Sequence, residues 1–283
     1  MTVRAFDTIL YEEADGVAWV TLNRPQRRNA FTYPMCLELQ EVWTTLRHRD
    51  EVRVVVLTAT GDDAFCTGID RSEVRTDWAE DDPAESAADT AAADKLMIAT
   101  PFMYDDPGRY LGPKANDLWK PVIAAVNGMA CAGAFYMLGE VDFIIAADHA
   151  TFFDPHLDYG MPITYEGVHM LQKMPLGEIL RLSLIGASER MSARRACEIG
   201  MVTEVVPAAE LREAASWAAA RIAAHDTLPV QATVRAIWNG REMHRSQAIA
   251  NCGPFSWLGT NSANLTRGQE RFSSGQRPPY RLR

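Results

Sequence analysis

Short and almost uninterrupted apolar runs alternate along the chain with segments in which apolar residues recur every three or four positions. Such runs predict strands, and those without alternating polar residues predict strands that are buried on both faces. We place these strands at residues 17–22, 53–59, 122–126, 143–147 and 203–206. Helical spacing predicts amphipathic helices at residues 35–46, 177–185, 193–198 and 208–224. The alternation of the two kinds of element predicts an α/β fold with mostly parallel strands.

Two parts of the chain depart from this alternation. Residues 73–118 are dominated by Asp, Glu and Ala up to residue 94, and then become rich in Gly, Pro and Tyr. This composition predicts a long surface excursion that is partly helical. From residue 207 onward only helical spacing continues. We therefore expect a core formed by residues 1–206 and an α-helical C-terminal region formed by residues 207–283.

Composition and charge exclude several classes of protein. Of the 283 residues, 28 are Lys or Arg and 37 are Asp or Glu, which leaves a net charge of −9. We expect no binding to nucleic acid or membranes, because both phosphate backbones and anionic lipids require basic surface. No apolar run reaches the roughly 18 residues that span a bilayer, and no signal peptide is visible. Five scattered cysteines without a CxxC pair indicate a cytoplasmic protein without a zinc site.

The common motifs of nucleotide, zinc and serine-hydrolase chemistry are absent from the sequence. What remains is a pair of segments rich in small residues, 64–70 and 127–134, each of which follows a predicted buried strand. Small side chains leave backbone N–H groups accessible, and two such segments side by side would form an oxyanion hole. Glycine clusters also serve close packing alone, so the spacing leaves a purely structural role open.

Several motifs together resemble the crotonase (enoyl-CoA hydratase/isomerase) superfamily along almost the whole chain. The matching stretches are residues 17–25, 28–30, 65–70, 120–128, 191–196, 200–206 and 277–280. The resemblance implies a core built as a spiral of ββα turns and a C-terminal helical region used for trimerisation. It also implies an acyl-CoA thioester substrate, of which coenzyme A is a part, with no separate cofactor and no metal. The expected assembly is a homotrimer or a dimer of trimers.

The same resemblance implies roles for individual residues. The backbone N–H groups of Ile69 and Gly133 fall where the family stabilises an enolate or a related oxyanion. The residues at positions where family members surround the coenzyme A moiety are Arg28, Ala30, Thr67, Gly68 and Asp70. Arg28 could meet a phosphate, although a lone arginine in a loop is usually a solvated charge.

Two catalytic positions differ from those of the family's hydratases, which carry a glutamate at each. Tyr136 stands three residues after the second oxyanion glycine, and His156 replaces the glutamate of a strand-end Pro-Glu. Adding water to a double bond needs one group to activate the water and one to protonate carbon. Histidine, with a reference pKa of about 6.5, is a capable base, whereas tyrosine, at about 10, is a poor one. We therefore expect His156 to carry proton transfer.

A carboxylate is expected to orient the His156 ring. Asp154, Asp158 and Glu166 are all close to it in the sequence. We favour Glu166, because it stands where the family usually has glycine and packing does not explain that exchange. The alternative is that Glu166 is a solvent-facing carboxylate near a helix N-terminus.

Three hypotheses about function remain. The first is a crotonase-type acyl-CoA enzyme of the hydratase/isomerase group with unusual catalytic residues. The second is hydrolytic cleavage of a carbon–carbon bond in a β-diketone or cyclic keto-acyl-CoA, which some superfamily members perform with a His–carboxylate pair. The third is a non-catalytic acyl-CoA binder. The sequence leaves the identity of the acyl group open.

Overall fold

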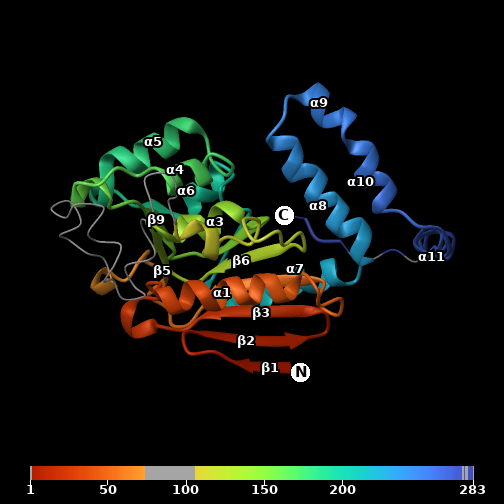
Figure 1. Cartoon of the computed structure of the whole chain (residues 1–283), viewed down its shortest axis with the longest axis horizontal. Coiled ribbons are helices and arrows are strands. Elements are labelled where there is room, and N and C mark those ends of the chain that lie inside the picture. Colours follow the sequence, from red (N-terminus) through yellow and green to blue (C-terminus); the bar gives the residue numbers. More distant parts are fainter. Residues whose placement is uncertain (1, 74–105, 276, 278–279, 283) are drawn as a thin grey trace, which may run out of the picture.

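Seven strands form the larger of two sheets in the computed structural model, which describes residues 2–73, 106–275, 277 and 280–282 (Figure 1). The order of its strands is β1-β2-β3-β4-β6-β8-β11. Their bounds are Thr2–Ala5 for β1, Ile9–Ala14 for β2, Val17–Leu22 for β3, Val54–Ala59 for β4, Val122–Val126 for β6, Phe143–Ala147 for β8 and Glu204–Val206 for β11. β1 to β3 form an antiparallel meander, and all the pairs from β3 to β11 are parallel. The predicted α/β class is confirmed.

The smaller sheet consists mostly of short strands that each follow a strand of the larger one. Its order is β10-β9-β7-β5, with bounds Met191–Ser192 for β10, Thr151–Phe153 for β9, Met129–Cys131 for β7 and Ala64–Cys66 for β5. β5 follows β4, β7 follows β6 and β9 follows β8, and these three short strands pair in parallel. Each of these strand pairs therefore adds one strand to the larger sheet and one to the smaller sheet, as a ββα spiral requires. With two or three residues, these strands are too short to show a period in the sequence.

Helices cover the sheets and continue beyond them. Their bounds are Tyr33–Leu46 for α1, Gly108–Leu111 for α2, Ala134–Glu140 for α3, Tyr165–Met170 for α4, Leu176–Ile185 for α5, Ala193–Glu198 for α6, Leu211–Ala223 for α7, Thr227–Arg241 for α8, Arg245–Ala250 for α9, Cys252–Leu258 for α10 and Ser262–Ser273 for α11. The four predicted helices correspond to α1, α5, α6 and α7. None of the helices in the described ranges is long and apolar enough to cross a membrane.

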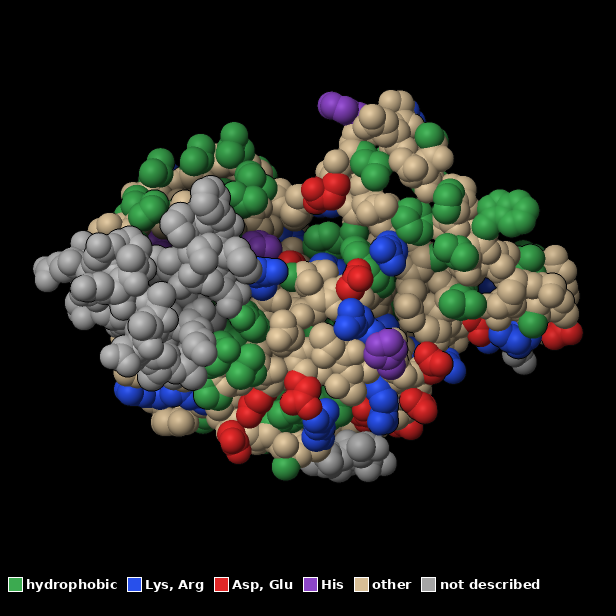
Figure 2. Space-filling model, viewed as in Figure 1, with side chains coloured by type: hydrophobic (Ala, Val, Ile, Leu, Met, Phe, Trp, Pro, Cys, Tyr) green, Lys and Arg blue, Asp and Glu red, His purple; other side chains and the backbone are tan. Residues whose placement is uncertain are grey.

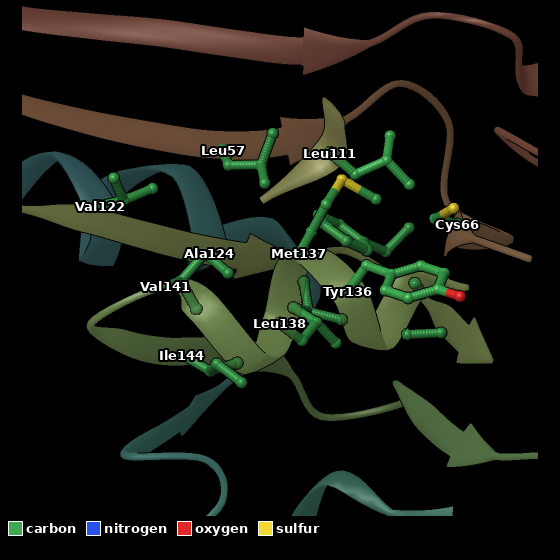
Figure 3. Close-up of a cluster of buried hydrophobic side chains, with 14 of the residues drawn as sticks. Leu57, Cys66, Leu111, Val122, Ala124, Tyr136, Met137, Leu138, Val141 and Ile144 are labelled. Atoms are coloured by element: carbon green, nitrogen blue, oxygen red, sulfur yellow. The ribbon is translucent and has the colours of Figure 1, made fainter. Parts of the chain in front are cut away.

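The parallel strands β4, β6 and β8 of the larger sheet are buried on both faces, which explains their apolar runs. In β4, Val55 and Leu57 face a cluster shared with α1, α3 and the smaller sheet, whereas Val54 and Val56 face α7. Figure 3 shows Leu57 within the first of these clusters. The buried face of α7 is mostly alanine, which lets the helix lie close against the strands. This parallel part of the sheet thus has no solvated face on which polar residues could alternate.

The four helices α8 to α11, residues 227–273, form what we call the helical arm, which projects beyond the sheets in Figure 1. None of these helices contains a buried residue. Trp238 of α8 anchors the arm by donating its indole N–H to Asp142 at 2.6 Å. The ammonium groups of Lys114 and Lys173 lie 5.6 and 4.9 Å from the Trp238 ring. The division of the chain at residue 206 stays a prediction.

The predicted surface excursion at residues 73–118 needs a correction at its end. Residues 74–105 lie outside the described residues, but most of residues 106–118 are buried. Leu111 and Leu118 are fully buried, and Trp43 of α1 donates its indole N–H to the Leu111 carbonyl at 3.1 Å. The prediction of a surface segment is wrong for this part, because its Gly and Pro residues shape a loop that packs against α1 and α3.

The buried cluster gives a first testable prediction. Leu57→Ala removes a fully buried side chain, so we expect the free energy of unfolding to fall by about 2–5 kcal/mol. Leu10→Ala makes the same change at a side chain that is 43% exposed, and we expect a change within about 0.5 kcal/mol. Urea unfolding of the two variants measures both. Equal losses of stability would contradict the packing described here.

Candidate active site

The two segments of small residues meet at the ends of neighbouring strands. β5 pairs in parallel with β7, so the chain that leaves β5 runs beside the chain that enters α3. A Cβ added to Gly68 would lie 3.0 Å from the Gly133 nitrogen, and one added to Gly133 would lie 2.5 Å from the Phe31 ring. Gly68 also has a φ of +82°, which favours glycine. Both positions therefore require glycine for the two segments to touch.

This contact leaves two backbone donors unused beside each other. The Phe31 N–H donates to the Gly68 carbonyl, and the Asp70 N–H donates to the Phe31 carbonyl, both at 2.8 Å. The N–H of Ile69, between these bonded groups, donates to no other group in the described part of the chain. The same holds for the N–H of Gly133 at the start of α3. The predicted pair of donors is thus brought together.

The residues expected around coenzyme A lie in the same loops, and their contacts differ. Arg28 is exposed and has a φ of +52°, while Thr67 donates its hydroxyl hydrogen to the Arg28 carbonyl at 3.4 Å. Asp70 is buried and accepts from Arg24 at 2.9 Å and from the Ser72 hydroxyl at 2.8 Å. These bonds outweigh the effect of burial and lower the pKa of Asp70. Asp70 therefore braces the loop that carries Ile69.

Ala30 is the last of the residues expected around coenzyme A, and Arg24 forms a hydrogen bond with its carbonyl. Its guanidinium donates to the Ala30 carbonyl at 2.5 Å, and Ala30 itself is buried. The one arginine thus ties the loop before α1 to the Asp70 loop. Sequence reasoning did not single out Arg24, although it belongs to the Asn-Arg-Pro turn of the matching motif.

His156 lies in the turn after β9, between two carboxylates. Its Nδ1 is 2.9 Å from Oδ1 and 3.0 Å from Oδ2 of Asp154, and its Nε2 is 3.4 Å from Oε1 of Glu166. Asp154 is fully buried and also accepts the backbone N–H of His156 at 2.9 Å. The preference for Glu166 over Asp154 as the ring's partner is therefore only half right, because each carboxylate takes one nitrogen. Asp158 instead accepts from the Ala187 N–H.

Glu166 does not face solvent, since only 6% of it is exposed. It shares a hydrogen-bonding contact with the hydroxyl of Tyr136, whose ring lies at the edge of the buried cluster and points its hydroxyl away from Met137 and Leu138 (Figure 3). The Tyr136 hydroxyl also donates to Oδ2 of Asp106 at 2.8 Å. The structure therefore joins Tyr136 and His156 through Glu166.

The pKa values of these groups shift for identifiable reasons. Burial opposes a charge on His156, but the hydrogen bond and the charge of Asp154, together with the charge of Glu166, outweigh it and raise the His156 pKa. Burial raises the pKa of Glu166 against the opposing charge of His156. Burial and the nearby carboxylates of Glu166 and Asp106 raise the pKa of Tyr136 far above its usual value. Tyr136 therefore stays protonated and is no base at neutral pH.

Two other kinds of chemistry, that of a thiolate nucleophile and that of a bound metal ion, are disfavoured at this site. Burial raises the pKa of the Cys66 and Cys131 thiols to about 12, so neither is a thiolate nucleophile at neutral pH. Within the described ranges, no group of three or more His, Cys, Asp or Glu side chains could hold a metal ion.

The family model described as enoyl-CoA hydratase/isomerase matches residues 12–272. The chain belongs to this family. An (E)-benzylidenesuccinyl-CoA hydratase of Thauera aromatica is 28% identical over 275 residues, which cover 96% of this chain and 98% of that protein. A short-chain-enoyl-CoA hydratase of Clostridium acetobutylicum is 28% identical over 86% of both chains.

Solved structures of the enoyl-CoA hydratase/isomerase family agree with the fold described above. An enoyl-CoA hydratase/isomerase from Mycobacterium paratuberculosis has a TM-score of 0.84 and 30% identity, and the match covers 99% of this chain and 100% of that one. An enoyl-CoA hydratase from Bacillus anthracis has a TM-score of 0.78 at 25% identity, over 97% and 99% of the two chains. The predicted crotonase fold is confirmed, and the chain is an enzyme of this family that acts on acyl-CoA.

Asp106 is a second site residue, besides Arg24, that sequence reasoning missed. Its residue type does not make it stand out, because it is one of many aspartates in this part of the chain. Its signal lies in the Asp-Pro-Gly sequence of residues 106–108, in which Oδ1 of Asp106 accepts the Gly108 N–H at 2.8 Å. Asp154, Pro155 and His156 form the same kind of turn. Two Asp-Pro turns thus aim two buried carboxylates into one site.

The contacts of His156 predict an unusual order of histidine titrations. We expect the pKa of His156 to lie above 6.5, whereas burial lowers that of His169 below it. In Asp154→Asn the main contribution that raises the His156 pKa is lost, so that pKa should fall while that of His169 stays unchanged. NMR of the imidazole rings as a function of pH measures both. An unaltered His156 pKa in Asp154→Asn would contradict the assigned contact.

Proposed function

We propose that this enzyme adds water across the double bond of a 2-enoyl-CoA thioester, with His156 as the group that activates the water. The observation that carries the proposal is the fixed orientation of His156, whose Nδ1 is held by the buried Asp154. Asp154 accepts the Nδ1 proton, so Nε2 is left as the base. The relatives from Thauera aromatica and Clostridium acetobutylicum, both named hydratases, support this reaction class.

In this mechanism the thioester carbonyl accepts from the N–H groups of Ile69 and Gly133. Negative charge grows on that oxygen as water attacks, and each donor of an oxyanion hole contributes about 2.7–4 kcal/mol of transition-state stabilisation. Nε2 of His156 takes a proton from the attacking water. The Asp154 carboxylate, fully buried beside Nδ1, stabilises the imidazolium that forms.

Coenzyme A would lie along the loops that lead to the two donors. The proposed binding residues are Arg28, Ala30, Thr67 and Gly68, with Asp70 as the brace of the loop. The exposed guanidinium of Arg28 suits a phosphate of coenzyme A. No cofactor besides the substrate's own coenzyme A is part of the proposal.

One observation favours a second candidate function, hydrolytic cleavage of a carbon–carbon bond in a β-diketone or cyclic keto-acyl-CoA. The Asp154–His156 pair has the arrangement that activates water for hydrolysis. The two functions separate on crotonyl-CoA, because a hydratase bleaches the absorbance of its conjugated thioester and a hydrolase of this kind leaves it unchanged. An unchanged absorbance with crotonyl-CoA bound would favour the second candidate.

The role of His156 gives a third prediction. We expect kcat of His156→Ala to fall by about 10²–10⁴-fold, the usual scale for losing a general acid or base. Tyr136→Phe removes only a hydroxyl from the same site and should reduce kcat less. The measurement is steady-state hydration of crotonyl-CoA, with binding of a saturated acyl-CoA checked by calorimetry.

The two variants control for each other. Full activity in His156→Ala would overturn the assignment of the base, and an inactive Tyr136→Phe would move the proton transfer to the opposite position. Equal acyl-CoA binding by both variants shows that the loss lies in the chemical step.

We further propose that the enzyme assembles as a homotrimer or a dimer of trimers through its helical arm. Large apolar side chains lie exposed along the arm, among them Ile237, Ile249, Trp257 and Phe272. Figure 2 shows apolar side chains gathered over these helices. Exposed apolar surface of this kind on helices that bury none of their own residues is typical of a subunit interface.

The assembly gives a fourth prediction. Trp257 is 85% exposed, and Trp257→Asp places a charge in the proposed interface, so we expect trimers to dissociate. Leu10→Asp makes a comparable change on the first antiparallel strands and should leave the assembly intact. Light scattering at micromolar concentration measures both. A wild-type chain that is monomeric under these conditions would contradict the proposal.

A further inference from the structure

Five side chains from four segments form one continuous chain of contacts through the site. It runs from Asp106, before α2, through Tyr136 of α3 and Glu166 of α4 to His156 and Asp154 after β9. Four of them are buried, and His156 is partly buried. The chain thus contains three carboxylates and only one group that becomes a cation. Its members cannot all be ionised, so their hydrogen bonds decide where the protons reside.

We propose that Asp106 is a positioning residue that, through Tyr136, keeps Glu166 protonated and thereby makes Glu166 the acid that delivers a proton to the substrate carbon. The proposal deepens the hydration mechanism above and rests on it for the identity of the base. It assigns the second proton-transfer group that water addition requires.

The first step of the argument is the direction of the hydrogen bonds. The Tyr136 hydroxyl has one hydrogen, and at 2.8 Å it donates this hydrogen to Oδ2 of Asp106. Oδ1 of Asp106 already accepts the Gly108 N–H at 2.8 Å, and two donated hydrogen bonds favour the ionised form of this carboxyl group. Tyr136 therefore has only lone pairs left for Glu166. A protonated Glu166 can donate to them, whereas an ionised Glu166 would face them with no hydrogen between.

The second step is that the geometry resists rearrangement. A Cβ added to Gly108 would lie 2.7 Å from the Tyr136 ring and 2.8 Å from Oδ1 of Asp106, so the loop is packed tightly against both. His169 contacts the other side of the Tyr136 ring edge-on, with 5.6 Å between the ring centroids. The ring therefore has little freedom to move the hydroxyl oxygen away from Asp106, and the hydrogen stays on the Asp106 side as long as that carboxylate accepts it.

The third step weighs the other groups that act on Glu166. Its own backbone N–H favours the ionised carboxylate, and so would a hydrogen donated by Tyr136. That hydrogen, however, is donated to Asp106. His156 favours an ionised Glu166 when it is itself protonated, and Asp154 opposes that ionisation by repulsion. Burial raises the pKa of the Glu166 carboxyl and is the largest influence on it. Behind Tyr136, burial keeps His169 neutral near pH 7 by lowering its pKa, so this ring adds no compensating charge. One proton is thus shared by the His156–Glu166 pair, and the Asp106–Tyr136 bond biases it towards Glu166.

The proton balance of the reaction closes with this assignment. The water oxygen bonds to C3 of the enoyl group while one of its protons goes to Nε2 of His156. The electron pair of the double bond moves through C2 to the thioester oxygen, and it returns as Glu166 gives its proton to C2. The proton on His156 then crosses to the Glu166 carboxylate 3.4 Å away, which restores the starting state. One water molecule is added, and no other reactant is required.

The test begins with a measurement that needs no catalysis. A protonated carboxylic acid has an infrared carbonyl band that a carboxylate lacks, and Glu166→Gln should remove this band from the neutral-pH spectrum. In Asp106→Asn, the amide oxygen still accepts the Gly108 N–H and the amide NH₂ faces the Tyr136 oxygen. The tyrosine hydrogen then turns to Glu166 and favours its ionised form. We expect the band to disappear in this nearly isosteric variant as well.

The kinetics of the same variants distinguish a positioning role from a merely structural one, because only the former changes kcat and the pH profile while KM stays nearly constant. We expect kcat of Asp106→Asn on crotonyl-CoA to fall by about 10²-fold with little change in KM, and the alkaline limb of its pH profile to move to lower pH. Adding Tyr136→Phe to Asp106→Asn removes the hydroxyl that stabilises the carboxylate. This double variant should therefore regain both the infrared band and a kcat close to that of Tyr136→Phe alone.

The outcomes separate this inference from the proposed function. A band that persists in Glu166→Gln or in Asp106→Asn overturns the inference, as does a double variant no more active than Asp106→Asn. If the band responds as expected but the wild-type enzyme does not hydrate crotonyl-CoA, the protonation of Glu166 by this network is supported and the hydration proposal fails.

Discussion

The direct contact between Gly68 and Gly133 is the constraint on which the site depends. It exists because the short strands β5 and β7 pair in parallel, so that the chain leaves both strands at the same edge of the smaller sheet. Neither glycine tolerates a Cβ there, and their closeness sets the separation of the two unused N–H groups. The parallel part of the larger sheet, buried on both faces, makes this edge rigid, since β5 directly follows β4 and β7 directly follows β6.

A tyrosine and an imidazole placed between three carboxylates determine how the site distributes charge. A pair of carboxylates must share a proton because like charges at close range cannot both ionise. Here the same result is reached with different groups: a neutral tyrosine separates Asp106 from Glu166, and an imidazole separates Glu166 from Asp154. The three acids are spaced by groups that can pass or hold a hydrogen.

The sequence predicted the parallel strands of the larger sheet, because strands buried on both faces have uninterrupted apolar runs. It did not predict the antiparallel strands β1 and β2. It missed β7 and β9, because three residues show no period, yet these strands position Gly133 and His156. His156 and Glu166 could be singled out by comparison with the family's usual residues.

Asp154 was among the candidates but could not be ranked above Glu166, and Asp106 could not be found at all, because its contact with Tyr136 joins distant segments. In each case the local Asp-Pro turn is visible in the sequence, but its target is not. The loop at residues 106–118 was also misjudged, since its composition is that of an exposed segment although its side chains are buried.

The anchoring of the helical arm through Trp238 has a consequence for how the subunit unfolds. The arm has no apolar core of its own, and cation–π and hydrogen-bond contacts of this kind contribute only about 0.5–2 kcal/mol each. In a lone subunit the arm therefore opens at a small fraction of the global free energy, and its amides exchange with solvent before those of the sheets. Neighbouring subunits that cover the arm would convert it from the least protected part of the chain into one of the most protected.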